Sequence, residues 1–150
     1  MFFIKMVNDP YKNQESISNL VNYAIRDKDK NLIRFYGGYN VDVLRAAEQI
    51  ERVKEYYQKT NNRLMRHIIV SFNEDITPYD AYVLGWQIAA YYADRYQIVF
   101  GVHEDTEHLH IHLVFNTVSF VDGLKYSGDY SDLVSFRSYV DQVVDSYLKW

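Results

Sequence analysis

The sequence predicts an α+β domain with a central antiparallel sheet, helices mainly on one face of the sheet and an active-site cleft on the other. The first observation is length, because 150 residues match a single domain spanning 1–150 and suffice to bury a core. The second is the alternation of strand-like segments with amphipathic, helix-like ones. The third is that two strand-like segments, 97–103 and 109–118, are too close in sequence for a parallel crossover, so they must pair antiparallel.

The first half of the chain contains one strand and two helices. Apolar residues 2–7 predict an opening strand that stops at an Asn-Asp-Pro sequence. Ser16 can cap a helix over 17–26, where apolar residues recur at helical spacing. Residues 35–39 are an aromatic, glycine-containing turn with room for a short strand, and residues 41–59 form a long amphipathic helix.

The second half supplies the rest of the sheet. Residues 64–72 predict a strand, and Thr77 caps a helix running to about residue 95 with a proline at its first position. After the two central strands, an Asp-Gly turn leads into a short strand at 124–126. Residues 132–148 predict a closing amphipathic helix.

Composition excludes several classes of protein. The chain has no cysteine, which rules out a disulfide scaffold and thiolate metal ligands. The N-terminus lacks a signal-peptide layout and no apolar run reaches the ~18 residues of a membrane span, so we expect no membrane segment and a cytoplasmic location. The net charge of −4 counts mildly against non-specific nucleic-acid binding, which usually leaves a basic footprint.

Four of the five histidines lie in residues 101–118. Side chains alternate along a strand, so His110, His112 and Asn116 share one face, while the opposite face is wholly apolar and must meet a core. Imidazoles at positions i and i+2 have Cβ atoms about 7 Å apart and can reach one ion above the sheet. A lone histidine here would usually be an ordinary polar-face residue; the pair, with His103 and several acids just upstream, favours a metal site.

Three motifs follow one another along the chain. The first is Leu20-Val21-Asn22-Tyr23-Ala24-Ile25-Arg26, the second is Arg66-His67-Ile68-Ile69-Val70-Ser71, and the third is His103-x-Asp105-x4-His110-x-His112-x3-Asn116. In this order they resemble the motifs of conjugative and mobilisation relaxases of the VirD2-like branch. Those enzymes belong to the HUH (histidine-hydrophobic-histidine) endonuclease superfamily.

The resemblance implies a nuclease that nicks one DNA strand at a transfer origin through a tyrosine nucleophile, leaving a 5′-phosphotyrosine. It implies that Tyr23 is the nucleophile and that Asp105 orients a ligand or accepts the tyrosine proton. The implied metal ligands are His103, His110 and His112, and the implied DNA contacts are Arg26, Arg66, Ser71 and Asn116. The expected cofactor is Mn²⁺ or Mg²⁺, although three imidazoles also suit other transition metals. The expected partners are single-stranded DNA and accessory mobilisation proteins.

Three alternatives remain open at this point. A single-tyrosine HUH transposase would carry its nucleophile after the histidines, which nominates Tyr139 or Tyr147. An origin-binding accessory protein that does not cut is favoured by the acidic net charge. A metal-dependent hydrolase unrelated to DNA would keep its activity without Tyr23, which is one of 15 tyrosines and could be an ordinary surface residue.

Overall fold

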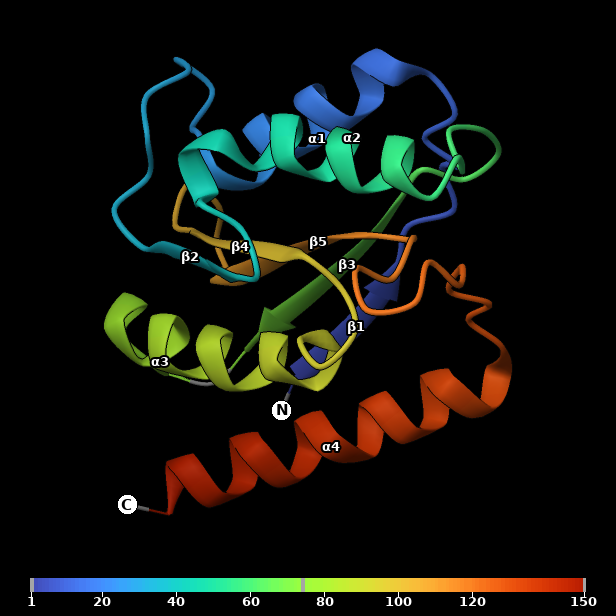
Figure 1. Ribbon diagram of the computed structural model, residues 1–150. Helices are drawn as coiled ribbons and strands as arrows, with labels where there is room; N and C mark the ends of the chain where they lie inside the picture. The colour runs from blue at the N-terminus through green and yellow to red at the C-terminus, as the bar shows by residue number, and fades with distance from the viewer. Residues whose placement is uncertain (1, 74, 150) are drawn as a thin grey trace.

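A computed structural model describes residues 2–73 and 75–149 and shows a five-stranded antiparallel sheet with the strand order β1-β3-β5-β4-β2 (Figure 1). The elements in chain order are β1 (Phe2–Met6), α1 (Gln14–Ile25), β2 (Tyr36–Tyr39), the 3₁₀ turn η1 (Val43–Arg45), α2 (Ala46–Tyr56), β3 (Met65–Phe72), α3 (Pro78–Ala89), the 3₁₀ turn η2 (Ala90–Tyr92), β4 (Ile98–His103), β5 (His110–Asn116) and α4 (Tyr130–Leu148). The predicted α+β class with an antiparallel sheet is confirmed.

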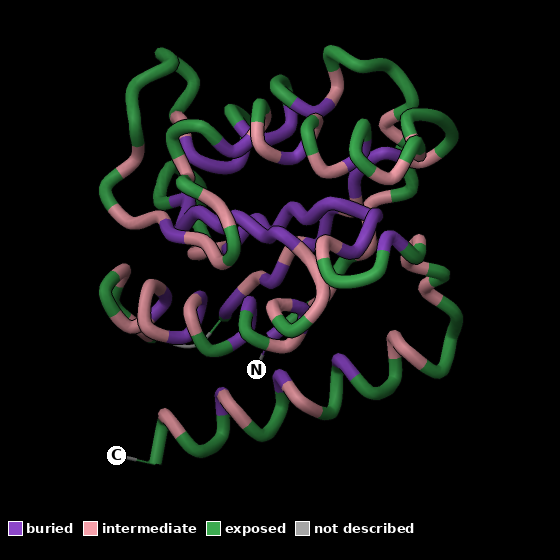
Figure 2. The backbone as a smooth tube through the Cα atoms, in the orientation of Figure 1, coloured by how far each residue is buried: buried purple, intermediate pink, exposed green. Residues whose placement is uncertain are grey.

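The helices cover both faces of the sheet, which differs from the expectation that they lie mainly on one. Helices α1 and α2 lie on one side of the sheet and α3 and α4 on the other (Figure 1). The sheet therefore separates two hydrophobic cores, one on each of its faces. Figure 2 shows the buried strands between helices that are partly exposed. Leu113 and Phe115 of β5 face α3 and α4, whereas Val114 faces α1 and α2. The histidine-bearing face is therefore apolar at its centre, and its cleft lies at one end.

Several local predictions need correction. Helix α1 begins at Gln14 with Asn13 as its N-cap, so Ser16 lies inside the first turn. The turn expected at 35–39 forms β2, which pairs with β4 at the sheet edge. The strand expected at 124–126 is reduced to a single bridge between Val118 and Lys125. The capping box at Thr77, in which Thr77 and Asp80 bond each other's backbone N–H, agrees with the predicted start of α3.

The helix expected at 41–59 ends at Tyr56, and a lysine is among the residues that it buries. Its first turn is 3₁₀, which leaves Leu44 exposed, and α2 then buries Ala46, Ile50 and Lys54. The Lys54 ammonium donates to the Leu64 carbonyl at 2.5 Å and to Asn116 Oδ1 at 2.6 Å. These acceptors explain how a lysine can occupy a core position of the helix. Within the described residues, no helix is long and apolar enough to cross a membrane.

Candidate metal centre and nucleophile

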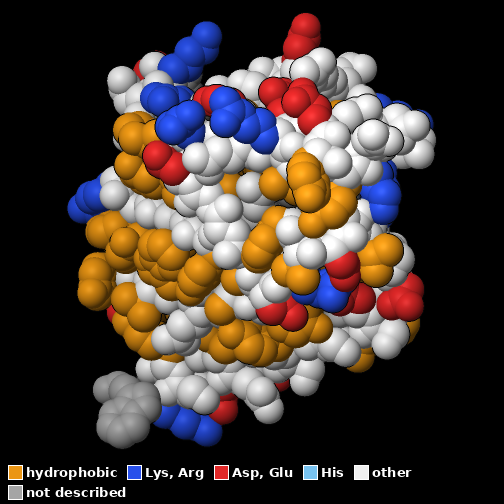
Figure 3. All heavy atoms as spheres, in the orientation of Figure 1, with side chains coloured by type: hydrophobic (Ala, Val, Ile, Leu, Met, Phe, Trp, Pro, Cys, Tyr) orange, Lys and Arg blue, Asp and Glu red, His pale blue; other side chains and the backbone are white. Residues whose placement is uncertain are grey.

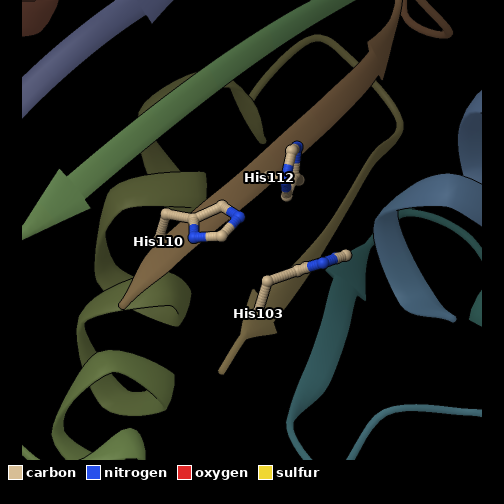
Figure 4. Close-up of side chains that lie close together, drawn as sticks. All are labelled: His103, His110 and His112. Atoms are coloured by element: carbon tan, nitrogen blue, oxygen red, sulfur yellow. The ribbon is translucent and has the colours of Figure 1, made fainter. Parts of the chain in front are cut away.

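Three histidines meet where the central strands end, beside the loop 104–109. His103, the last residue of β4, is the antiparallel partner of His110, the first residue of β5. His112 lies two residues further on the same face, and one ring nitrogen from each histidine lies within 4.8 Å of the other two (Figure 4). His103 and His112 are buried and His110 is half-buried. The cluster therefore has one side open to solvent.

Two of the three rings are held in a defined tautomer by carbonyl oxygens, which can only accept hydrogen bonds. His103 Nε2 lies 2.9 Å from the Ala24 carbonyl oxygen, so it carries the proton and Nδ1 keeps a free lone pair. His110 Nδ1 lies 3.2 Å from the His108 carbonyl oxygen and 3.1 Å from Thr106 Oγ1, whose own proton goes to that carbonyl oxygen, so Nδ1 carries the proton. His110 Nε2 is then free to act as a ligand.

His112 supplies the observation that best fits a metal. Its Nδ1 lies 2.8 Å from His67 Nε2, and, within residues 2–73 and 75–149, its buried Nε2 has no hydrogen-bond partner. Burial lowers the pKa of His112 to about 2, and that of His67 to about 4. Both rings are therefore neutral at physiological pH. A neutral imidazole with an unpaired, buried nitrogen beside two others is a donor set that suits a divalent cation.

Tyr23 lies over this cluster. Helix α1 buries Leu20 and Ala24 against the sheet, and Tyr23 sits at the border of that face with 53% of its surface exposed. Its ring centroid lies 4.9 Å from that of His112 and 6.1 Å from that of His103. The helix therefore brings a solvent-accessible phenol to the open side of the three histidines.

Two depressions flank Tyr23. The larger, about 670 Å³, is bordered by His103 and His110 and, just after α1, by the basic residues Arg26, Lys28 and Lys30 with Asp27 among them. The smaller, about 530 Å³, is lined mainly by Asp9, Tyr11, Ser16, His67 and Ile69. An extended ligand that crosses Tyr23 would meet one depression on each side of the tyrosine.

The structure separates the predicted site residues into two groups. Arg26 lines the larger depression, and so does Asp105, which is exposed. Burial lowers the pKa of His103, and the charge of Asp105 opposes that shift only in part. Among the described residues, Asp105 makes no hydrogen bond to a histidine, and the Ala24 carbonyl oxygen is the group that orients His103. Ser71 is half-buried and pairs with His110 across the β3–β5 ladder, near the cluster.

Arg66 and Asn116 lie away from the cleft, contrary to the expectation that both contact DNA. Side chains alternate along β3, so Arg66 points to the opposite face from His67, with its guanidinium 5.8 Å from the centre of the Tyr126 ring. Asn116 is fully buried, where its amide donates to Gln97 and accepts from Lys54. Asn116 is thus enclosed by core residues, and Arg66 lies on the sheet face opposite the histidines.

Sequence reasoning missed the contacts behind His112. Tyr11 Oη lies 3.0 Å from His67 Nδ1, and His67 in turn contacts His112. The two-residue alternation of β3 puts His67 on the cluster face, which was a usable signal. Tyr11 lies in the loop after β1 and carries no periodicity that could have placed it.

The tyrosines of the transposase alternative lie elsewhere. Tyr139 donates to the Gln87 carbonyl oxygen at 2.6 Å, and Tyr147 donates to Asp80 at 2.7 Å. Both bonds join α4 to α3, on the sheet face opposite the histidines. Neither hydroxyl can reach the cluster without removal of α4 from the fold.

Aromatic residues also gather around β2 and α3. Phe35 lies 5.0 Å from Tyr82 between ring centroids, the Arg34 guanidinium covers Phe35 at 4.8 Å, and Tyr39 donates to the Trp86 carbonyl oxygen. Figure 3 shows a hydrophobic patch over this part of the molecule. These rings are packed on one another, so most of the tyrosine content here is structural.

Comparison with known proteins identifies the family. The relaxase family described as MobA/VirD2-like, nuclease domain, matches residues 20–148. The chain belongs to this relaxase family. The protein rlx of Staphylococcus aureus is 26% identical to this protein over 143 residues, which cover 95% of this protein and 42% of that relative. The group II intron-interrupted relaxase LtrB of Lactococcus lactis is 33% identical over 75 residues, covering 48% of the chain and 13% of that relative.

A solved structure agrees on the fold. The structure described as "Molecular Basis of Vancomycin Resistance Transfer in Staphylococcus aureus" matches 99% of the relaxase chain and 92% of its own, with a TM-score of 0.67 and 15% identity. At this identity the likeness concerns the fold alone. The chain spans less than half the length of the curated relatives it matches.

Proposed function

We propose that this chain is the nicking domain of a DNA relaxase, which cuts one strand of a transfer origin through Tyr23. The observation that carries the proposal is the position of the Tyr23 ring, half-exposed and against three histidines that converge on one point. Membership in the relaxase nuclease family supports the reaction class. Single-stranded DNA is the proposed substrate, and accessory mobilisation proteins are proposed partners.

The reaction is a transesterification at phosphorus. Tyr23 Oη forms a bond to the phosphorus of the scissile phosphodiester, the bond from phosphorus to O3′ breaks, and the proton lost by the phenol is balanced by one gained at O3′. The products are a 5′-phosphotyrosine and a free 3′-OH. Because one phosphoester replaces another, a 3′-OH can reverse the step and reseal the strand.

The residues around Tyr23 divide the remaining tasks. Arg26, Lys28 and Lys30 supply positive charge for phosphates on one side of the tyrosine. Ser71 is a further proposed backbone contact. A phenol has a pKa near 10 and needs help to ionise, and Asp105, on the same depression, is the proposed proton acceptor.

His103, His110 and His112 would hold the cofactor, for which Mn²⁺ and Mg²⁺ are the proposed candidates and another transition metal is compatible with three imidazoles. A divalent cation held there would polarise the non-bridging phosphate oxygens and stabilise the charge of the displacement. The histidines contribute by being preoriented through their second nitrogens and partly screened from water.

The proposal is tested with single-stranded DNA that carries a candidate transfer origin and a label on the 3′ side of the nick, incubated with Mn²⁺ and resolved on a denaturing gel. Wild type is expected to give a protein-sized labelled band, and Tyr23→Phe is expected to give none. Tyr139→Phe is the matched control and should retain the band. A band that survives Tyr23→Phe would contradict the assignment of the nucleophile.

Two further outcomes have defined meanings. Loss of the band in Tyr139→Phe, with Tyr23→Phe unaffected, would favour the transposase alternative. DNA binding without cleavage by the wild type, on an origin that a full-length relative cuts, would make the chain a binding module instead of a nuclease. Nicking that persists in His112→Ala would contradict the metal centre.

A further inference from the structure

His112 differs from the other two histidines of the cluster in how its second nitrogen is held. His103 is fixed by the Ala24 carbonyl oxygen, and His110 by the His108 carbonyl oxygen together with Thr106 Oγ1, whose own proton goes to that same carbonyl oxygen. His112 Nδ1 instead faces His67 Nε2 at 2.8 Å, and His67 Nδ1 faces Tyr11 Oη at 3.0 Å. Each of these two contacts can run in either direction, so the tautomer of His112 depends on the whole chain of contacts.

We propose that Tyr11 and His67 are a positioning pair that holds His112 in the tautomer whose Nε2 lone pair faces the metal. This inference rests on the proposed function, because it assumes the three-histidine metal centre. In the metal-competent arrangement, His112 Nδ1–H donates to His67 Nε2 and His67 Nδ1–H donates to Tyr11 Oη. The Tyr11 hydroxyl, which is half-buried, directs its own proton outward.

The reversed arrangement is incompatible with metal binding. If Tyr11 donates to His67 Nδ1, then His67 Nε2–H donates to His112 Nδ1, and His112 must carry its proton on Nε2. That nitrogen is buried, and among the described residues no acceptor is within reach. A buried donor without an acceptor is unfavourable, so the protein itself disfavours this arrangement before any metal arrives.

The loop after β1 holds Tyr11 in one defined position. Tyr11 has a positive φ of 47°, a conformation that bulky residues rarely adopt. Its backbone N–H donates to Asp9 Oδ1 at 2.9 Å, and its carbonyl accepts from the Leu64 N–H at 3.2 Å. Arg63 donates to the Asp9 carbonyl at 2.8 Å and fixes the loop further. Several contacts thus maintain a strained residue whose hydroxyl meets His67.

The first test compares two substitutions of His67 by their affinity for Mn²⁺, measured by calorimetry. His67→Gln keeps an acceptor near the Nε2 position, whereas His67→Leu fills the space without one. Loss of such a supporting contact typically weakens metal binding by about 10–100-fold, which is the expected effect of His67→Leu, and His67→Gln should stay within about threefold of wild type. Tyr11→Phe should weaken binding by a smaller factor, and the control Tyr139→Phe, which loses a bonded hydroxyl on the opposite sheet face, should not.

The second test reads the tautomer directly, so that it does not depend on activity or on the folding of one variant. In metal-free protein labelled with ¹⁵N-histidine, His112 of the wild type should show a protonated Nδ1 and an unprotonated Nε2, and Tyr11→Phe should shift it toward a mixture. A protonated Nε2 in the wild type would overturn the positioning pair.

The two proposals fail in distinguishable ways. Mn²⁺ binding by the wild type with unchanged affinity in a folded His67→Leu would overturn the positioning pair and leave the metal centre intact. No Mn²⁺ binding by the wild type would overturn the metal centre and, with it, the role of the pair.

Discussion

Gly101 controls how closely α1 approaches the sheet, and its replacement by alanine is the most informative single change. Gly101 pairs with His112 across the β4–β5 ladder. A Cβ at this position would lie 1.9 Å from the Ala24 carbonyl oxygen and 2.7 Å from Ile33 Cδ1. Ordinary contact begins at 3.4 Å, so α1 must retreat by about 1.5 Å, and the obstacle is backbone that cannot rotate away.

The expected cost follows from this geometry. Overpacking against a well-packed core typically costs about 1–3 kcal/mol, and a backbone obstacle places Gly101→Ala at the upper end. For a domain of this size, about 3 kcal/mol lowers the melting temperature by about 6–12 °C. The same retreat lengthens the bond from His103 to Ala24 and displaces Tyr23, so nicking should fall by about 100-fold.

The assays are thermal melting by circular dichroism and the labelled-DNA gel. Gly37→Ala is the matched control, because the nearest atoms to its Cβ belong to the Trp86 side chain, on the face away from the histidines. That variant should melt earlier than wild type but nick at the wild-type rate once folded. A Gly101→Ala protein that melts within about 2 °C of wild type and nicks normally would refute the packing argument.

Three other predictions follow from the structure. Arg26→Met should weaken single-stranded DNA binding and reduce the slope of log affinity against log salt by about 0.7, whereas Arg66→Met should leave both unchanged. Equal effects of the two substitutions in a filter-binding titration would contradict the placement of the two residues on opposite faces of the sheet. Lys54→Met removes two buried hydrogen bonds and should lower the free energy of unfolding, measured with urea, by about 1–3 kcal/mol without changing Mn²⁺ affinity. An unchanged unfolding midpoint would argue against a stabilising role for these two hydrogen bonds. Burial lowers the pKa values of His67 and His112, to about 4 and about 2. Below pH 6.5 the unfolded chain therefore binds protons that the metal-free folded protein does not. The free energy of unfolding should be highest above that pH and should fall by up to about 1.4 kcal/mol per pH unit for each histidine as the pH drops. A free energy of unfolding that stays constant from pH 7 to 5 would contradict the burial of the two histidines.

The sequence predicted the parts of the site that obey periodicity. Alternation along β5 placed His110 and His112 on one face, and the short loop before it required an antiparallel partner carrying His103. The apolar spacing of α1 placed Tyr23 at the edge of a buried face, where the structure has it. These predictions needed only the geometry of one strand and one helix.

Features that depend on tertiary packing were not predictable in this way. The first motif and the third could be joined only through the fold, and alternation alone did not indicate that α1 and α2 would cover the histidine face. Asn116 lies on the predicted face of β5, but Lys54 from α2 reaches it and closes it off from DNA. Arg66 directly precedes His67, which contacts the cluster, and therefore points to the opposite face of the sheet. Tyr11 reaches the site from an irregular loop, for which no pattern exists.

The most direct test of the central claim is to identify which tyrosine carries DNA. The nicked complex would be digested with nuclease and trypsin and its nucleotide-linked peptide sequenced by mass spectrometry. Cleavage after Lys12 and Arg26 releases residues 13–26, in which Tyr23 is the sole tyrosine. We expect the nucleotide on this peptide and joined to Tyr23 through its 5′-phosphate. A nucleotide on the peptide 138–149, which holds Tyr139 and Tyr147, or a cut strand with no linked peptide, would contradict the account.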